Sequence, residues 1–335
     1  MTARSVERLS VAFQSDKSPQ DYAELGALVE DYGFGTVSVY SDLLFQPPLP
    51  ALLHIAGATR RIRLGPACLN PYTLHPVEIA GQIAALDAAA DGRAYLGLAR
   101  GAWLDSLGIA DPRPLTTLRE TIAVVYHLLR GERAPFTGQV FQLAAHHALQ
   151  YPVRRADVPL LIGAWGARLA GLAGATAAEV KVGGSANPAL IDVMRAAIAR
   201  GEAVAGRPAD SVGIVLGAVT VVDEDGARAR ELARQEVARY LPVVAALDRT
   251  VTIETALLER LDECVRAGDL HAAGALIGDD LLDRFAFAGT PEQIIRQTEA
   301  ILAAGAARVE FGTPHGLSSR EGLRLLGARV LPAFR

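Results

Sequence analysis

Residues 65–101, GPACLNPYTLHPVEIAGQIAALDAAADGRAYLGLARG, contain parts of two short apolar runs separated by a segment with helical periodicity. The runs, RIRLGPAC at 61–68 and AYLGLA at 94–99, have the length of β-strands. Residues 77–91 between them are predicted to form a helix that ends before Gly92. The stretch therefore predicts a strand–helix–strand unit.

The same unit repeats along the chain. Eight apolar runs are predicted to be strands, at residues 8–13, 36–40, 61–68, 94–99, 158–164, 178–184, 212–222 and 307–312. Almost every run is followed by a helix, and continuous apolar strands of this kind form parallel sheets that helices cover on both faces. We therefore expect an α/β fold, a closed (β/α)8 TIM barrel with insertions. The rival is an open doubly wound sheet, which should have a Gly-rich phosphate-binding motif after its first strand, but residues 11–19 contain no glycine.

The chain has 335 residues, whereas a plain barrel of this type needs about 250. We assign the surplus to two insertions, at about 132–157 and 243–288, the second mostly helical. No short repeat, low-complexity tract or linker interrupts the chain, so residues 1–335 are expected to form one domain.

The composition excludes several classes of protein. The net charge is −4, with 33 basic and 37 acidic residues scattered among one another, which argues against binding to nucleic acid or to an anionic membrane surface. No run approaches the roughly 20 apolar residues of a membrane span, so we expect a cytoplasmic protein. Cys68 and Cys264 form no Cys-x-x-Cys pair, so neither a disulfide framework nor a metal site is expected. The lack of a His-x-His after the first strand also argues against a zinc hydrolase.

Polar and Gly-rich sequence follows the predicted strands. In chain order these segments are SDLLFQPP (41–48), LNPYTLHP (69–76), RGAW (100–103), AWGAR (164–168), GGSANP (183–188) and GTPHG (312–316). In a barrel of this kind the carboxyl ends of all strands meet on one rim, where the active site lies. We therefore expect a site on that rim, in which Gly-rich loops can hold a phosphate with backbone N–H groups.

Three segments resemble the luciferase-like flavin and deazaflavin oxidoreductase family, most closely the F420-dependent branch of methylenetetrahydromethanopterin reductase. They are residues 65–101, 159–184 and 285–316, which together span much of the chain in the family's order. The resemblance implies a cofactor that lies across the rim of the barrel, and it implies a homodimer.

The resemblance also implies which residues contact the cofactor. A cis peptide bond without proline is expected near Ala67–Cys68, in a wall stiffened by Pro66, Asn70, Pro71 and Pro76 that packs against the cofactor's central ring. The other implied cofactor contacts are Ser41, Asp42, Gly101, Ala102 and Trp103 near the ring and its side chain, and Gly163, Ala164, Trp165, Gly166, Lys181, Val182, Gly183 and Gly184 near the phosphate.

Two cofactors fit this pattern, F420 and FMN, and the NPYT-x-HP loop and the C-terminal VEFGTPHG resemble the F420 side. Deazaflavin passes hydride but reacts poorly with oxygen, so an F420 enzyme transfers two electrons. We expect hydride transfer between the deazaflavin C5 and an unsaturated carbon of a small, mostly apolar substrate with a C=C, C=N or C=O bond. Asp42, Cys68 and His75 are the catalytic candidates, as proton donors, with Tyr72 as a further donor.

Two alternatives stay open, an FMN-dependent luciferase-like monooxygenase and a non-catalytic flavin-binding barrel. The sequence also departs from the sugar-phosphate dehydrogenase branch of the family. That branch has a His after the aspartate and a Glu after the strand-four glycines, where Leu43 and Trp103 stand here. A sugar-phosphate dehydrogenase activity is therefore not expected.

Overall fold

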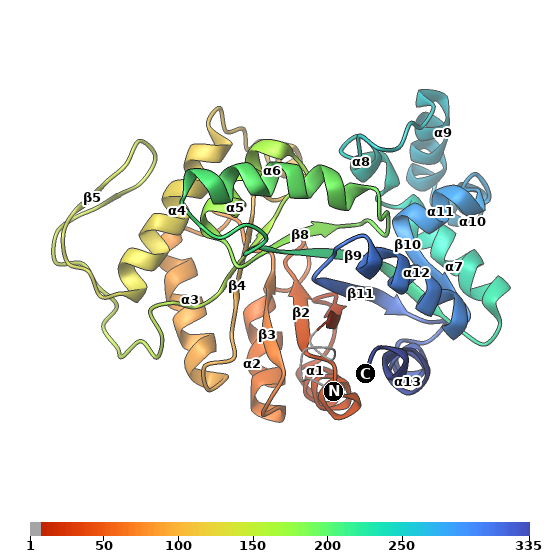
Figure 1. Ribbon diagram of the computed structural model, residues 1–335, viewed down its shortest axis with the longest axis horizontal. Helices are drawn as coiled ribbons and strands as arrows, with labels where there is room; N and C mark the ends of the chain where they lie inside the picture. The colour runs from red at the N-terminus through yellow and green to blue at the C-terminus, as the bar shows by residue number, and fades with distance from the viewer. Residues whose placement is uncertain (1–7) are drawn as a thin grey trace.

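The computed structural model describes residues 8–335 and confirms the predicted barrel (Figure 1). Its eight parallel strands are β1 (Leu9–Phe13), β2 (Thr36–Tyr40), β3 (Arg63–Ala67), β4 (Leu96–Ala99), β7 (Leu160–Gly163), β8 (Glu179–Gly183), β9 (Gly213–Val222) and β11 (Arg308–His315). They are hydrogen-bonded in the order β3-β2-β1-β11-β9-β8-β7-β4. Two bridges, Leu64 to Ala94 and Leu69 to Leu98, join β3 to the β4 side and complete the ring.

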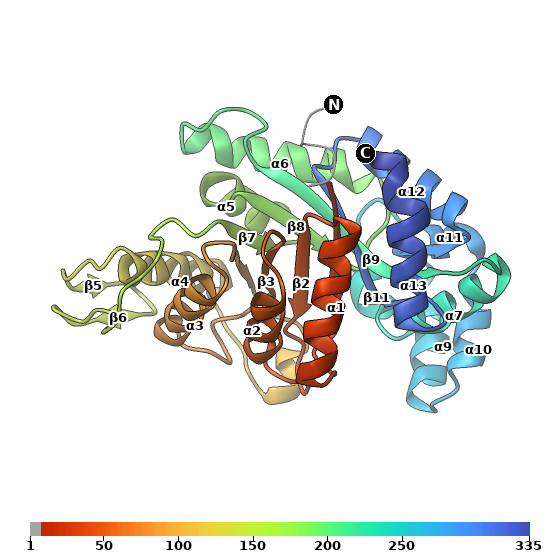
Figure 2. The ribbon, with the colours of Figure 1, turned by 90° about the horizontal axis from the view of Figure 1, so that it is seen from below.

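Helices surround the strands, and Figure 2 shows α1, α2 and α3 side by side along one flank. The helices that follow barrel strands are α1 (Pro19–Tyr32), α2 (Pro48–Ala58), α3 (Pro76–Ala89), α4 (Pro114–Leu129), α5 (Ala167–Thr176), α6 (Leu190–Val204), α7 (Gly226–Ala238) and α13 (Ser319–Leu325), and α12 (Pro291–Ala303) precedes β11. Several begin with proline at the first turn, where no intrahelical N–H partner is needed. Shorter helical turns follow β4 at Leu104–Leu107 and close the chain at Leu326–Val330 and Leu331–Phe334.

The first predicted insertion contains a small antiparallel hairpin, β5 (Phe136–Thr137) and β6 (Gln142–Leu143), which projects from the barrel at the left of Figure 1. The carboxylate of Glu120 on α4 accepts hydrogen bonds from the backbone N–H groups of Gln139, Val140 and Phe141, at 2.8 to 3.0 Å. One acidic side chain thus fixes the tip of the hairpin to the barrel's outer layer.

The second predicted insertion is helical. It contains α8 (Leu241–Ala245), α9 (Thr255–Arg266), α10 (Leu270–Ala275) and α11 (Asp279–Phe285), which pack with α7 around an apolar cluster of their own. It ends in a strand that the sequence did not predict, β10 (Ala286–Gly289), which pairs with the last four residues of β9. A four-residue strand directly after a helix carries no periodicity of its own, so only its pairing reveals it.

Candidate active site

The carboxyl ends of the strands bring together the loops that the sequence singled out. Ser41 and Asp42 follow β2, Cys68 follows β3, and residues 101–103 follow β4. Residues 164–166 follow β7, whereas Lys181, Val182 and Gly183 belong to β8 itself and Gly184 follows it. The barrel therefore places nearly all the predicted cofactor contacts on or just below one rim.

The peptide bond between Ala67 and Cys68 is cis, at the position that the family resemblance implied. The thiol of Cys68 lies beside Gly97 and Gly163, because a Cβ placed on these glycines would come within 3.4 and 3.2 Å of its Sγ. Burial raises the pKa of the Cys68 thiol to about 12. Cys68 is therefore a protonated thiol at neutral pH, a weak donor and not a thiolate nucleophile.

Asn70 stiffens the same loop. Its side-chain Oδ1 accepts hydrogen bonds from the backbone N–H groups of Tyr72 and Thr73, both at 3.0 Å. On its other side lies Gly101, which has a φ of 88° and no room for a side chain, because a Cβ there would come within 3.3 Å of the Asn70 side chain. The loops after β3 and β4 are thus packed against each other.

Asp42 is half-buried and accepts a hydrogen bond at 2.9 Å from Nε2 of Gln14, which follows β1. Sequence reasoning missed Gln14, although its position directly after a strand was a usable signal. Beyond Asp42 the loop becomes apolar and exposed: Leu44 is 98% exposed and Phe45 is also exposed. Trp103 and Leu107, after β4, are exposed too, so large apolar side chains face solvent on the loops after two strands of the rim.

His75 and Tyr72 have structural partners. His75 is exposed and caps α3, where its Nδ1 accepts from the N–H of Val77 at 3.3 Å, and its ring packs edge-on against Phe141. Tyr72 donates its hydroxyl proton to Asp111 at 2.6 Å, and burial together with this carboxylate raises the pKa of Tyr72. Both contacts hold the long loop after β3 against its surroundings.

The start of α5 is open to an anion. No side chain caps the helix, and a Cβ placed on the cap residue Gly166 would meet nothing within 4 Å. The first N–H groups of a helix have no intrahelical partner and together attract negative charge. Trp165 lies beside this opening and donates from Nε1 to the carbonyl of Gly183 at 3.0 Å, which ties the loop to β8.

Lys181 lies elsewhere than the sequence suggested. It was expected to contact a phosphate at the rim, but it points into the barrel, is 5% exposed, and donates from Nζ to the carboxylate of Glu310. The alternation of side chains along β8 explains the difference, because a residue two positions before Gly183 on the inward face lies below the rim.

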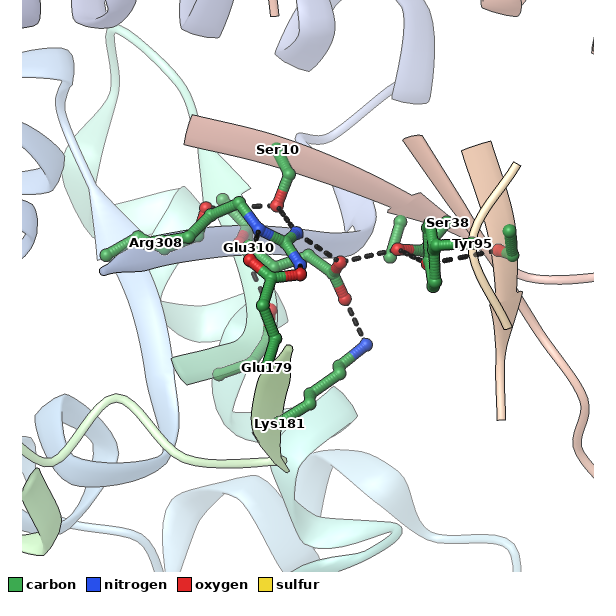
Figure 3. A network of polar contacts seen from close by, with 12 residues as sticks. Ser10, Ser38, Tyr95, Glu179, Lys181, Arg308 and Glu310 are labelled. Atoms are coloured by element: carbon green, nitrogen blue, oxygen red, sulfur yellow. Dashed lines mark hydrogen bonds and ion pairs between the residues drawn. The ribbon is translucent and has the colours of Figure 1, made fainter. Parts of the chain in front are cut away.

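Figure 3 shows the group of side chains that Lys181 joins, which we call the barrel network: Ser10, Ser38, Tyr95, Glu179, Lys181, Arg308 and Glu310. Arg308 makes two hydrogen bonds to Glu179, at 2.8 and 3.1 Å, and another to Ser10 at 2.7 Å. Ser38 links Glu310, at 2.6 Å, to the Tyr95 hydroxyl, at 2.7 Å. The interior of the barrel therefore contains a connected cluster of paired charges and hydroxyl groups.

The two carboxylates of the barrel network are matched by the two cations, Lys181 and Arg308. Burial by itself would raise the pKa of Glu310, but the charges of Lys181 and Arg308 outweigh it and hold the pKa below its ordinary value. Burial likewise opposes the charge of Glu179, and Arg308 again lowers that pKa. Both carboxylates are thus ionised at neutral pH, and both are paired, as buried charges require.

Tyr40 separates the barrel network from the rim. Its ring centre lies 4.9 Å from Nζ of Lys181, and burial, followed by the charges of Glu310 and Asp42, raises the pKa of Tyr40 well above its usual value. Its hydroxyl reaches Gly312, where any side chain would collide with it. Sequence reasoning missed Tyr40 because it is the last residue of a strand buried on both faces.

Among residues 8–335 no three His, Cys, Asp or Glu side chains are grouped so that they could hold a metal ion. Within the same residues no helix combines the length and the apolar character needed to cross a membrane.

Known proteins resemble this chain over nearly its full length. A family model described as "Luciferase-like monooxygenase" matches residues 5–308. The 5,10-methylenetetrahydromethanopterin reductase of Methanopyrus kandleri is 29% identical over 339 residues, covering 96% of each chain. The F420-dependent glucose-6-phosphate dehydrogenase of Nakamurella multipartita is 27% identical over 335 residues, covering 95% of this chain and 93% of that one. The solved structure of the coenzyme F420 dependent tetrahydromethanopterin reductase from Methanopyrus kandleri has a TM-score of 0.89 at 28% identity and covers 98% of this chain and 99% of that chain.

Proposed function

Because the chain belongs to the luciferase-like monooxygenase family, we propose that it is an F420-dependent oxidoreductase of the reductase branch. The observation that carries the proposal is the full-length similarity to two kinds of enzyme. One is an F420-dependent dehydrogenase, and the other is a methylenetetrahydromethanopterin reductase whose solved structure is described as coenzyme F420 dependent. The proposed reaction is hydride transfer between the deazaflavin and a small, mostly apolar substrate with a C=C, C=N or C=O bond.

The residues at the rim fit this cofactor. A planar ring needs a floor and a wall, and Tyr40 and the loop from Cys68 to Asn70 offer these surfaces, with Gly101 leaving the rim free of a side chain beside Asn70. The phosphodiester of F420 is an anion, and the uncapped start of α5 at Gly166 suits it. Bound F420 supplies two-electron hydride chemistry.

The chain's own residues bind, orient and shield the reactants. Asp42, held by Gln14, lies after β2 near the ring position and is the candidate that we propose to hold a proton for the substrate. Cys68 keeps its proton because burial raises its pKa to about 12. Leu44, Phe45 and Trp103 offer apolar surface that excludes water from a bound substrate.

A titration with each cofactor tests the proposal. The purified protein is mixed with F420 and, separately, with FMN, while fluorescence is followed. We expect saturable binding of F420 and, once reduced F420 is bound, its oxidation by a panel that includes methylenetetrahydromethanopterin, a simple ketone and a cyclic enone. Binding of FMN with consumption of oxygen would instead establish a monooxygenase, and binding without any turnover would indicate a non-catalytic barrel.

Asp42 has its own test. The variant Asp42→Asn keeps the hydrogen bond to Gln14 in size and geometry but cannot hold a proton. We expect F420 binding to stay within about threefold, while kcat with the best substrate of the panel falls by about 100-fold, in the range expected of general acid–base catalysis. Unchanged kcat would exclude Asp42 as the donor. Gln14→Leu, which frees Asp42 without removing its carboxyl group, is the matched control and should lower kcat less than Asp42→Asn does.

We also propose a homodimer, which the family resemblance implies, and a cytoplasmic location, which rests on the lack of a long apolar run in the sequence. Light scattering on the purified protein tests the homodimer.

A further inference from the structure

The barrel network has two ends with different surroundings. At one end Arg308 is enclosed by Glu179 and Ser10, and Glu179 also faces the partly exposed Arg63 at 3.8 Å. At the other end the ammonium group of Lys181 lies under the ring of Tyr40. Only the second end therefore adjoins the residues of the rim.

The charge of Lys181 affects the pKa of a side chain at the rim. Burial raises the pKa of the Cys68 thiol. Among the charged groups near this thiol, Lys181 has the largest effect and lowers the pKa, whereas Glu310 has a smaller effect and raises it. The ring of Tyr40 lies over the same ammonium group, whose Nζ is 4.9 Å from the ring centre and so within the range of a cation–π contact. Two side chains next to the rim therefore lie close to one buried cation.

Lys181 and Glu310 form a buried ion pair whose two charges can be removed one at a time by mutation. Lys181 and Glu310 are 5% and 0% exposed, so no solvent screens them from a ring that lies on Tyr40. Glu310 has further partners, Ser38 and Arg308, whereas its carboxylate accepts the only hydrogen bond that Lys181 donates within the described chain. Removal of Glu310 leaves Lys181 without its hydrogen-bonded carboxylate, and removal of Lys181 leaves Glu310 paired with Arg308 alone, so each change alters the charge beneath the rim.

Resting on the proposed F420-dependent function, we propose that Lys181 and Glu310 are positioning residues that act through Tyr40 on the charge of the bound deazaflavin. Lys181 favours the anionic form of the ring and Glu310 opposes it. The chemistry of the ligand makes this possible, because the oxidised deazaflavin of F420 has a ring hydroxyl conjugated to its pyrimidine carbonyl groups. This hydroxyl loses its proton near neutral pH and the negative charge spreads over the ring. A charge about 8 Å away through an effective dielectric constant of about 20 shifts a pKa by roughly 1.5 units.

Other ionisable groups also face this position, and Arg308, which is enclosed at the remote end of the barrel network, is the second cation among them. From the strands packed around Lys181 and Tyr40 they are Arg308 and Glu310 on β11, Glu179 on β8, Tyr95 before β4, Cys68 after β3, Asp42 after β2 and Tyr240 between α7 and α8. Burial raises the pKa of Cys68, Tyr95 and Tyr240, so these three stay neutral across the pH range in which F420 ionises.

The test uses oxidised F420 and the complete protein. Absorbance and fluorescence titrations between pH 5 and 9 give the pKa of bound F420 and its affinity in each protonation state. We expect Lys181→Met to raise the pKa of bound F420 by about 1.5 units and to weaken binding of the anionic form about 30-fold, with the neutral form unaffected. Glu310→Gln, whose amide oxygen can still accept from Lys181 while its NH2 group donates to the Ser38 hydroxyl, should shift the pKa of bound F420 in the opposite direction.

The opposite signs separate this role from a structural one, which would weaken both forms alike in both variants. Glu179→Gln is the matched control, because it removes a carboxylate of the same network at the end remote from Tyr40 and should shift the pKa less than Glu310→Gln. Thermal unfolding of each variant reports whether it folds, and the result for Glu310→Gln suffices if Lys181→Met does not.

Shifts of the same sign in both variants, or no shift in Glu310→Gln, overturn the inference. Failure of the wild-type protein to bind F420 overturns the proposed function and this inference with it. Normal binding with an unshifted pKa overturns the inference alone.

Discussion

Two Gly-containing segments on the rim, residues 163–167 at the end of β7 and 183–188 at the end of β8, differ in their surroundings. At Gly166 there is open space and an uncapped helix. At the other loop the N–H groups of Gly184 and Ser185 both donate to the carbonyl of Gly217, at 2.6 and 3.1 Å, and that of Ala186 donates to Arg284 at 2.9 Å. Glycine content alone therefore does not predict an anion site, because such a site needs backbone N–H groups that have no other partner.

The helical segment at 243–288 causes the difference. Asn187, which is 2% exposed, donates from Nδ2 to Asp248 at 3.1 Å and to Thr250 at 2.7 Å, so it joins the loop after β8 to the connection between α8 and α9. Gly184 lies against Val244 and Tyr240 of the same region. The loop after β8 is thus part of a packed interface, while the loop after β7 faces outward.

The largest expected effect comes from breaking that interface. Asn187→Ala leaves the buried carboxylate of Asp248 with one donor fewer, and we expect it to lower the free energy of unfolding by about 2 to 3 kcal/mol. The affinity for F420 should change less than threefold. Denaturant unfolding and an F420 titration measure the two quantities, and a large loss of affinity in a stable variant would mean that the loop after β8 contacts the cofactor.

A smaller loss of stability is expected at Gly184. Its φ is 81°, and a Cβ there would come within 3.1 Å of the Val244 side chain. Because a left-handed conformation costs a residue with a Cβ about 1 to 2 kcal/mol, Gly184→Ala should lose this amount in denaturant unfolding. Retention of full stability would show that the loop can relax away from α8.

At the loop after β7 we expect a substitution to change the affinity for F420 more than the stability of the protein. Gly166→Asp adds a carboxylate at the cap of α5, where it satisfies a helix N–H group but repels the phosphodiester of F420. We expect affinity to fall about tenfold while stability stays equal or rises by about 1 kcal/mol. Gly166→Ser caps the helix without adding a charge, so it is the control and should retain more affinity. Equal F420 affinities for Gly166→Asp and Gly166→Ser would show that the phosphodiester of F420 does not lie at the start of α5.

The smallest effect is expected from Gly166→Ala. A Cβ at this position meets nothing, and the loss of a favourable cap residue costs about 0.5 kcal/mol. Stability and F420 affinity should both stay close to wild type. A loss of several kcal/mol would show that the open space beside α5 is closed in solution.

The sequence predicted the local features of the fold but not the contacts between residues that are distant in the chain. Strand and helix positions follow from local periodicity, and the family resemblance, confirmed by the family model, predicted the cis bond at Ala67–Cys68. The barrel network was not predicted, because it joins residues as distant as Ser38 and Glu310. A strand covered on both faces has no alternating pattern, so nothing local indicates that Tyr40 or Glu310 points inward.

The surroundings of the two cysteines bear on how the protein can be labelled. Burial raises the pKa of Cys68 to about 12, so its thiol reacts far more slowly with a maleimide dye than an ordinary cysteine does. Cys264 lies on α9, in the outer helical segment, where it is partly buried against the apolar cluster. Neither native thiol is fully exposed, so selective labelling requires an added surface cysteine, and the two native ones can stay in place.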